Sequence, residues 1–376
     1  MVVSIVRSTI KEVDEKLREA LDLINYQPQK DKIFLKPNIV DAANPKLGVT
    51  THPKIIEALL LYFQGLGKEV VIGEGTGFFN TDEKFKKLIK DSGYAKLKEK
   101  YGIEIVNLEN TERVKKSWNY GEIELPKYLE THEYVNVPTM KTHNQTTVTL
   151  GLKNQKGLLK LADKKRFHQV DLNGMIRELA TVAKPDLVVM NAIYCCEATG
   201  PAVFGSKPKQ MDLLIAGKDV IEIDNVSARI MGFDPTKIPH IPERTDIEIR
   251  GMAIEEVQSD FEPPKPYLQI RNIFAYYDEK TCTSCTINLS RAFMKVFFTP
   301  ELRQELETKE EIDLLFGTSP LPENHSPTVI CIGKCAKPTA EEYQLPFIKG
   351  CPPSYRDLIN FLFNNYYERK AENENS

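Results

Sequence analysis

Four cysteines in the last quarter of the sequence have the residue type and spacing of metal ligands. The chain contains seven cysteines, and none precedes Cys195. A C-x2-C pair is followed by two single cysteines in predicted turns, which gives the set Cys282, Cys285, Cys335 and Cys351. In a reducing compartment, clustered cysteines favour metal binding or catalysis over disulfides. Four thiolates satisfy both a 4Fe–4S cluster and a structural zinc ion.

The spacing favours the cluster over zinc. Structural zinc usually binds two C-x2-C knuckles, whereas this sequence has one knuckle and two isolated cysteines. A helix predicted over residues 286–296 would direct its positive end toward the cluster sulfurs. Cys331 lies inside an apolar strand and is expected in the core, as are Cys195 and Cys196. A zinc site and a set of buried cysteines without a ligand are the alternatives.

A second group of residues has the chemistry of an anion site. From Lys141 to His168 the sequence has seven lysines and arginines against one acid, Asp163. Three of the lysines are expected to form a solvated face: Lys160, Lys164 and Lys165. The others alternate with threonine, asparagine and glycine: Lys141, Lys153 and Lys156. Such ammonium and amide donors suit a carboxylate or a phosphate.

Polar residues at strand ends and helix starts complete this group. We expect the anionic ligand or cofactor to be bound by Lys36, Asn38, Thr51, His52, Lys153, Asn154 and Lys156. The predicted catalytic residues are His143, His168 and Lys141. Reduction of an organic substrate usually requires a proton donor, and the pKa of a histidine lies near working pH. The glycine-rich turn 73–77 would add backbone amides near the anion.

These residues require a scaffold of short buried strands and amphipathic helices. Apolar runs predict strands over 32–35, 69–73, 103–106, 134–137, 187–190, 211–216 and 327–332. Helices are predicted over 53–63, with Thr50 or Thr51 as N-cap, and over 355–363. The fold class is therefore α/β, with a parallel or mixed sheet and helices on both faces. Such a sheet presents its ligand crevice at the carboxyl ends of its strands.

The proline-rich segment 261–266 predicts a domain boundary, because proline does not continue a helix or a central strand. We expect an α/β domain with the anion-binding crevice over residues 1–262. A smaller α/β iron–sulfur domain is expected over residues 267–376. A short, stiff linker would dock the second domain on the first. The polar tail 368–376 is expected to fray.

Composition argues against several classes of protein. The sequence has 376 residues, and its 50 lysines and arginines against 53 acids give a net charge of −3, so no nucleic-acid partner is expected. Hydrophobic residues at 41% and charged residues at 27% are typical of a globular chain. The sequence has no run of about 18 apolar residues. It also shows no signal-peptide pattern, so we expect a cytoplasmic protein without a membrane partner.

Several short motifs, taken as a set, resemble the family known as domain of unknown function 362, over about residues 1–240. The matching stretches are 36–38, 50–53, 73–75, 141–143, 152–157, His168, 200–201 and 216–219. The resemblance implies a fold more than a reaction. Many members are similar in pairing this domain with an iron–sulfur unit, often a two-cluster ferredoxin insert. This chain departs from that pattern with a single-cluster module after the domain.

The C-terminal cysteines carry a second resemblance, over about residues 278–365. The C-x2-C pair, the G-x-C at 333–335 and the G-C-P-P at 350–353 are similar to the proximal-cluster motif of nickel–iron hydrogenase and respiratory complex I small subunits. The resemblance implies one 4Fe–4S cluster, held by the four cysteines at the edge of a flavodoxin-like half-sheet.

These observations favour an iron–sulfur oxidoreductase that passes electrons through one 4Fe–4S cluster to an anionic small molecule or cofactor in the first domain. A ferredoxin-like protein is a candidate electron donor. One alternative is a lyase or isomerase with a structural cluster, and another is an electron carrier or a metal-cofactor assembly protein. The sequence has no G-x-G-x-x-G fingerprint, so nicotinamide or flavin binding by a standard Rossmann turn is not expected.

Overall fold

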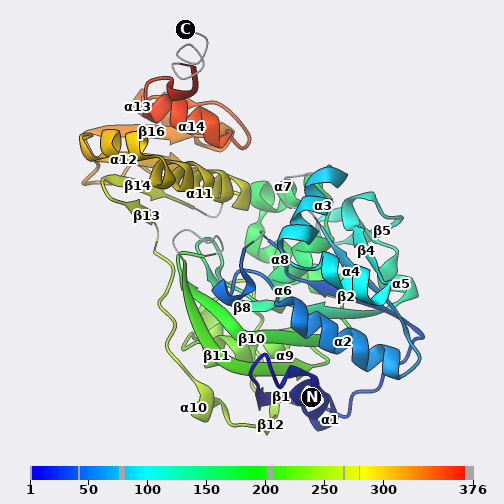
Figure 1. The fold of residues 1–376 in the computed structure, drawn as a ribbon. Helices are drawn as coiled ribbons and strands as arrows, with labels where there is room; N and C mark the ends of the chain where they lie inside the picture. Colours follow the sequence, from blue (N-terminus) through cyan, green and yellow to red (C-terminus); the bar gives the residue numbers. More distant parts are fainter. Residues whose placement is uncertain are drawn as a thin grey trace. The chain divides into compact units, whose positions relative to one another are not determined.

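The computed structural model describes residues 2–40, 43–75, 81–200, 206–265, 267–278 and 280–368. These residues form two compact units, of which the first ends at Pro264 and the second begins at Lys265 (Figure 1). Each unit has a sheet of its own. Within the described ranges, no helix is long and apolar enough to cross a bilayer. The tail that was expected to fray lies almost wholly outside the described residues.

The first unit is built on a mixed, ten-stranded sheet. Its strands are β1 (Val2–Arg7), β2 (Lys32–Pro37), β3 (Glu69–Glu74), β4 (Glu104–Asn107), β7 (Glu133–Val137), β8 (Thr139–His143), β9 (Thr147–Thr149), β10 (Leu187–Ala198), β11 (Ser206–Gly217) and β12 (Glu248–Gly251). The order is β12-β1-β11-β10-β7-β2-β3-β4, with β8 between β10 and β9. Strands β10, β7, β2, β3 and β4 run parallel, whereas β11 is antiparallel to both β10 and β1. A separate hairpin joins β5 (Arg113–Trp118) to β6 (Gly121–Pro126).

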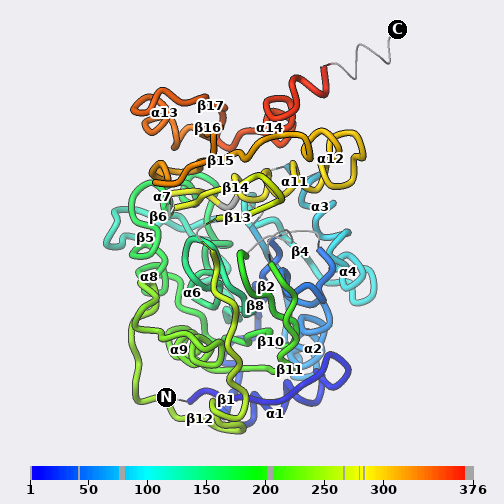
Figure 2. Tube along the Cα trace, turned by 90° about the vertical axis from the view of Figure 1, so that its left-hand side faces the viewer, coloured from blue at the N-terminus to red at the C-terminus, as the bar shows by residue number. Residues whose placement is uncertain are grey.

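Helices cover both faces of this sheet. One face carries α1 (Val13–Leu23), α2 (Pro53–Gly65), α3 (Asp82–Asp91) and α4 (Ala95–Tyr101). The other carries α6 (Gly151–Asn154), α7 (Leu161–Val170), α8 (Leu172–Val182) and α9 (Val220–Ile230), and two further short helices are α5 (Tyr128–Thr131) and α10 (Ile254–Val257). Side chains alternate between the two cores, as in β2, where Phe34 faces one core and Ile33 and Leu35 face the other. Figure 2 shows α8 and α9 on one side of the strands and α2 on the other. The predicted α/β class is confirmed.

The chain changes direction across the sheet at β2. Strands β3 and β4 follow on one side of β2, whereas β7 and then β10 follow on the other. The parallel strands β7, β2 and β3 all end at the same edge. In open α/β sheets, the crevice at such a switch point is the usual place for a ligand.

The second unit has a five-stranded sheet in sequence order. It contains β13 (Tyr267–Ile270), β14 (Ile273–Tyr276), β15 (Ile312–Phe316), β16 (Thr328–Ile332) and β17 (Phe347–Ile348), of which only β13 is antiparallel to its neighbour. Its helices are α11 (Thr283–Phe298), α12 (Pro300–Glu307), α13 (Lys337–Tyr343) and α14 (Tyr355–Leu362). Helices α11, α12 and α14 pack on one face, and residues around α13 pack on the other.

One local prediction was wrong, and one strand was missed. The residue that caps α2 is His52, not Thr50 or Thr51: His52 Nδ1 accepts a hydrogen bond from the Lys54 N–H at 3.1 Å. The segment that contains Lys141 and His143 follows β7, as expected, but it is itself the strand β8, which pairs with β9 and β10. This strand is hard to recognise in the sequence because its polar residues hydrogen-bond inside the protein rather than to water.

A close approach at Gly48 offers a test of the fold. Gly48 has φ of 70°, and a Cβ there would overlap the backbone of Cys195 in β10. Gly67 has φ of 72°, and a Cβ there would meet nothing within 4 Å. Gly67→Ala should therefore lose only about 1–2 kcal/mol for its left-handed backbone. Gly48→Ala should lose several kcal/mol in urea unfolding, because the backbone of β10 cannot give way. Equal losses would contradict this packing.

Candidate functional site

A buried ion pair lies at the carboxyl ends of β2 and β3. Lys36 Nζ is 2.9 Å from Oε1 of Glu74 and 3.1 Å from its Oε2. The exposed fractions of the two side chains are 0% and 4%. Lys36 Nζ also donates to the Pro37 carbonyl at 2.9 Å and to Asn154 Oδ1 at 3.3 Å. Burial lowers the pKa of Lys36, and the charge of Glu74 opposes that effect.

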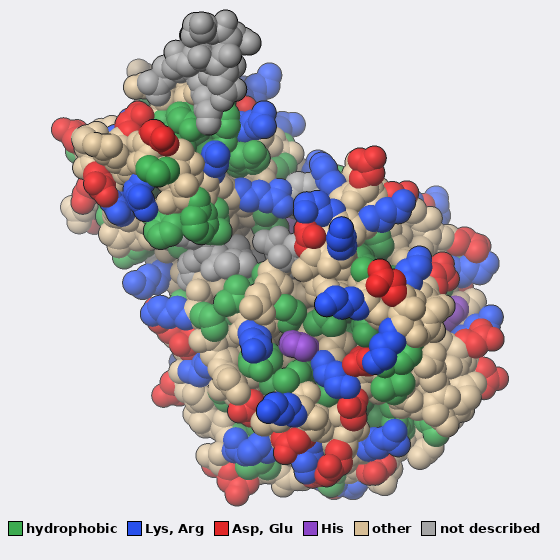
Figure 3. Space-filling model, in the orientation of Figure 1, with side chains coloured by type: hydrophobic (Ala, Val, Ile, Leu, Met, Phe, Trp, Pro, Cys, Tyr) green, Lys and Arg blue, Asp and Glu red, His purple; other side chains and the backbone are tan. Residues whose placement is uncertain are grey.

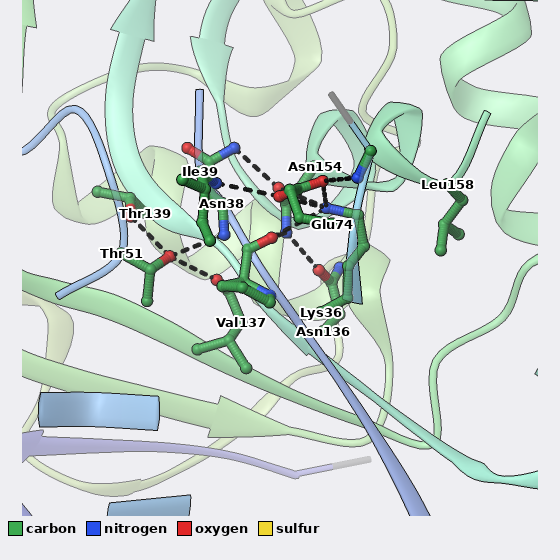
Figure 4. A network of polar contacts seen from close by, with 12 residues as sticks. Lys36, Asn38, Ile39, Thr51, Glu74, Asn136, Val137, Thr139, Asn154 and Leu158 are labelled. Atoms are coloured by element: carbon green, nitrogen blue, oxygen red, sulfur yellow. Dashed lines mark hydrogen bonds and ion pairs between the residues drawn. The ribbon is translucent and has the colours of Figure 1, made fainter. Parts of the chain in front are cut away.

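Amide side chains extend this pair into a network across three strands and α6 (Figure 4). Asn154 Oδ1 accepts from Asn38 Nδ2 at 2.8 Å, and Asn154 Nδ2 donates to Asn136 Oδ1 at 2.7 Å. Glu74 accepts the backbone N–H groups of Ile39 and Gly75 at 3.0 and 2.8 Å. The network therefore fixes the chain just after β2 and just after β3.

Thr51 and Lys141 join the network from the side of β7 and β8. Thr51 Oγ1 accepts from the Asn38 N–H at 2.9 Å and donates to the Val137 carbonyl at 2.8 Å. Lys141 Nζ donates to Asn38 Oδ1 at 2.7 Å and to the Val49 carbonyl at 2.5 Å. Five of the predicted site residues are thus joined by hydrogen bonds: Lys36, Asn38, Thr51, Lys141 and Asn154. His52 instead uses its side chain to cap α2, and burial with the charge of Lys46 lowers its pKa to about 4.

Further cationic residues surround the network. Burial lowers the pKa of Lys141 to about 8, and burial with the charge of Lys141 lowers that of Lys153 to about 7. Lys156 Nζ lies 3.0 Å from His168 Nε2. Glu74 is the buried acid of this group, and the bridging residues are neutral amides. Among the described residues, this cluster therefore carries an excess of buried positive charge, which an anion would offset.

The expected proton donor His143 does not have a pKa near neutrality. Its ring is buried, and Nδ1 accepts from the Gln145 N–H at 3.1 Å. Burial, with the charges of Lys153, Lys156, Lys141 and His168, lowers its pKa well below the usual value. A neutral imidazole is a weak acid, so the sequence-based reason for this role does not hold for His143. The sequence could not show that three lysines and His168 lie near it.

Sequence reasoning missed three buried residues of this unit. Lys164 was expected on a solvated face, yet it is 8% exposed, and burial lowers its pKa to about 8. A signal was available, because Lys164 precedes His168 by one helical turn and shares its face of α7. Glu74 is the last residue of β3 and is flanked by two glycines. Asp224 accepts the N–H groups of Gly151 and Leu152 at 2.7 and 2.8 Å and so positions α6.

On the face shown in Figure 3, the lysines and arginines of the first unit are interspersed with acids. Lys160, for example, pairs with Glu124 at 2.7 Å, and its side chain is 41% exposed. The buried lysines of the network, in contrast, gather at the carboxyl edge of the parallel strands.

The four predicted metal ligands lie at one edge of the second unit. Cys282 is the N-cap of α11, and Cys285 follows in its first turn. Cys335 lies in the short 3₁₀ helix after β16, and the neighbouring Lys334 N–H donates to the Gly350 carbonyl at 2.8 Å, next to Cys351. The pKa of Cys285 is raised well above its usual value by a hydrogen bond to Cys282, by burial, and by the charges of the other cysteines: Cys282, Cys335 and Cys351. All four thiols are thus close enough to influence one another.

The spacing of these thiols bears on what they could hold. The Sγ atoms of Cys282 and Cys285 are 3.8 Å apart, which is the separation of two sulfurs bound to one zinc ion with bonds of about 2.3 Å. In the described part of the chain, no three cysteines, histidines or acids are grouped closely enough for a single metal ion. A cubane holds its sulfurs farther apart, because each binds a different iron. Cys331 lies in the core of the sheet instead.

Comparison with known proteins identifies the first unit. The model of the family described as "Domain of unknown function (DUF362)" matches residues 33–229, over half of the chain. The chain belongs to this family. It is 26% identical over 238 residues to the thylakoid-associated protein sll1697 of Synechocystis sp. (strain ATCC 27184 / PCC 6803 / Kazusa). The aligned region covers 61% of this chain and 72% of that protein. No solved structure matches the chain.

The match to the DUF362 family covers one of the two candidate sites. The range 33–229 contains the whole lysine and asparagine network, from Lys36 to Asp224. The four cysteines lie outside it. The buried network therefore lies within the part of the chain that matches the family, and the cysteine site lies outside it.

Two buried lysines should respond in opposite ways to removal. Lys141→Met leaves Asn38 Oδ1 and the Val49 carbonyl without their donor, so it should lower the free energy of unfolding by about 1–3 kcal/mol. Lys153 makes no hydrogen bond or ion pair with any described residue, so Lys153→Met should preserve or raise stability by removing an uncompensated buried charge. Urea unfolding of both variants measures this difference. A large loss of stability in Lys153→Met would indicate a structural role.

Proposed function

We propose that this chain is an iron–sulfur oxidoreductase. In this proposal, Cys282, Cys285, Cys335 and Cys351 hold one 4Fe–4S cluster, and the DUF362 domain binds the anionic small molecule or cofactor that exchanges electrons with it. The observation that carries the proposal is the convergence of the four cysteines, from three separate segments, at one edge of the second unit. A reducing cytoplasm suits such thiolates, and a ferredoxin-like protein is the proposed electron donor.

The chain's own residues would divide the work of the first unit. Lys153 would bind an anionic oxygen, because its buried ammonium has no acid nearby among the described residues. Lys141 would add a second positive charge while it holds Asn38 in place. The hydrogen-bonded pair Lys156 and His168 would hold the proton that a reduced substrate takes up. The cluster, when bound, would supply one-electron transfer.

Zinc is the second candidate for the cysteine site. The 3.8 Å separation of Cys282 and Cys285 favours it, because this is the spacing of a zinc knuckle. A zinc site would make the second unit structural and would leave the family domain to act without a redox centre.

Metal analysis separates the two. After anaerobic purification, the protein should contain iron and sulfide in equal amounts and absorb near 400 nm. Serine substitution at each of the four predicted ligands should abolish this absorption. Cys331→Ser is the matched control, because Cys331 lies a few residues away in the core of β16. One zinc and no iron per chain would overturn the cluster.

The anion site should depend on pH in a defined direction. Sulfate, which does not titrate in this range, should raise the melting temperature at pH 6 by binding to the folded state. That effect should fall as the pH rises from about 6 to 9, because Lys153 and Lys141 lose their charges at pKa values of about 7 and 8. Without sulfate, the stability of the protein should depend on pH in the opposite direction. A lysine with a lowered folded pKa costs stability while it is protonated, so stability should rise over the same interval.

Two variants control for general salt effects of sulfate. Lys153→Met should lose the step near pH 7, whereas Lys160→Met, at an exposed ion pair, should behave as the unaltered protein. Equal stabilisation of all three proteins at every pH would argue against an anion site.

A further inference from the structure

Lys153 lies on a segment of backbone that hydrogen bonds hold in place on both sides. The backbone of α6 is fixed by Asp224, which accepts two of its N–H groups, and by Asn154, which hydrogen-bonds to Asn136 and Asn38. Lys153 lies between these anchors and is 8% exposed. Among the described residues, Nζ of Lys153 has no hydrogen-bond or ion-pair partner. The structure thus presents a buried amine on a rigid segment.

The surroundings of Lys153 favour the neutral form of this amine. Burial lowers the pKa of this amine to about 7, and the charge of Lys141 acts in the same direction. Lys141 is joined to α6 by hydrogen bonds through Asn38, which donates to Asn154. Lys36, in contrast, has the carboxylate of Glu74 beside it. A desolvated lysine next to another cation is the arrangement that turns an ammonium into a nucleophile near neutral pH.

We propose that Lys153 is a catalytic nucleophile that forms an imine with a small anionic carbonyl compound, such as a 2-oxo acid. This inference rests on the anion site of the proposed function but not on the cysteine site. The amine of Lys153 attacks the carbonyl carbon, a C–N bond forms, and the carbonyl oxygen leaves as water. No oxidant or reductant is consumed. Lys141 attracts the carboxylate of this compound.

Reductive trapping tests this proposal. Glyoxylate, the smallest aldehyde with a carboxylate, is added with cyanoborohydride to the full chain, purified anaerobically, and labelled lysines are mapped by mass spectrometry. At pH 7 Lys153 should react at least about tenfold faster than the exposed Lys160, because an ordinary lysine is almost wholly protonated there. Glycolate, which has the carboxylate without the aldehyde, should slow the labelling of Lys153 but not that of Lys160.

A variant separates the nucleophile from the charge of Lys153. Lys153→Arg keeps the charge and should lose the labelled site while sulfate still raises the melting temperature.

The outcomes also separate this inference from the proposed function. If glycolate and sulfate stabilise the protein but Lys153 reacts no faster than Lys160, the nucleophile is overturned and the anion site stands. If neither anion stabilises the protein and labelling is not selective, both the imine and the anion site are overturned. Iron and sulfide analysis of the same preparation reports independently on the cysteine site.

Discussion

The first unit depends on the buried ion pair between Lys36 and Glu74. Two full charges at the ends of neighbouring strands are removed from water, so the loss of either partner would leave the other uncompensated, at a cost of about 3–5 kcal/mol. Glu74 also accepts the N–H groups of Ile39 and Gly75, so the paths of both following segments depend on this carboxylate. The ion pair leaves no room for a side chain at position 157, because a Cβ on Gly157 would overlap both charged groups. The 3₁₀ helix Gln155–Leu158, which follows α6 and contains Gly157, therefore packs directly against the ion pair.

The residues that connect the network are neutral, and this determines the net charge of the site. Asn38, Asn136 and Asn154 bridge β2, β7 and α6 with amides, which satisfy donors and acceptors without adding negative charge. Carboxylates at these positions would have neutralised the lysines. The amides fix the geometry and leave the ammonium groups of Lys141 and Lys153 electrostatically uncompensated. The crevice is therefore rigid before a ligand binds, which reduces the entropy lost on binding.

The sequence predicted the scaffold well and the interior of the site only in part. Strands such as β2 and β3 were predicted because buried β-branched and aromatic runs have few other solutions in an α/β chain. Strand β8 was not, because a run with Lys141 and His143 resembles a loop until its partners are known. Five site residues were brought together by one rule, the carboxyl edge of parallel strands. The burial of Lys164 and the lowered pKa of His143 depend on distant segments, which local patterns do not encode.

In both units the candidate site lies where strands end, but the ionised groups of the two sites have opposite charge. In the first unit, the edge gathers ammonium groups, which repel one another and lower the pKa of Lys153. In the second, it gathers thiols, and burial with the charges of Cys351 and Cys282 raises the pKa of Cys335. Each set opposes its own ionisation, so a ligand of the opposite charge would stabilise it: an anion for the lysines and metal cations for the thiolates. Because both sets are buried or half-buried, they lower the stability of the ligand-free protein, and a bound ligand would offset that loss. An increase in stability on ligand binding is therefore the property expected of both sites.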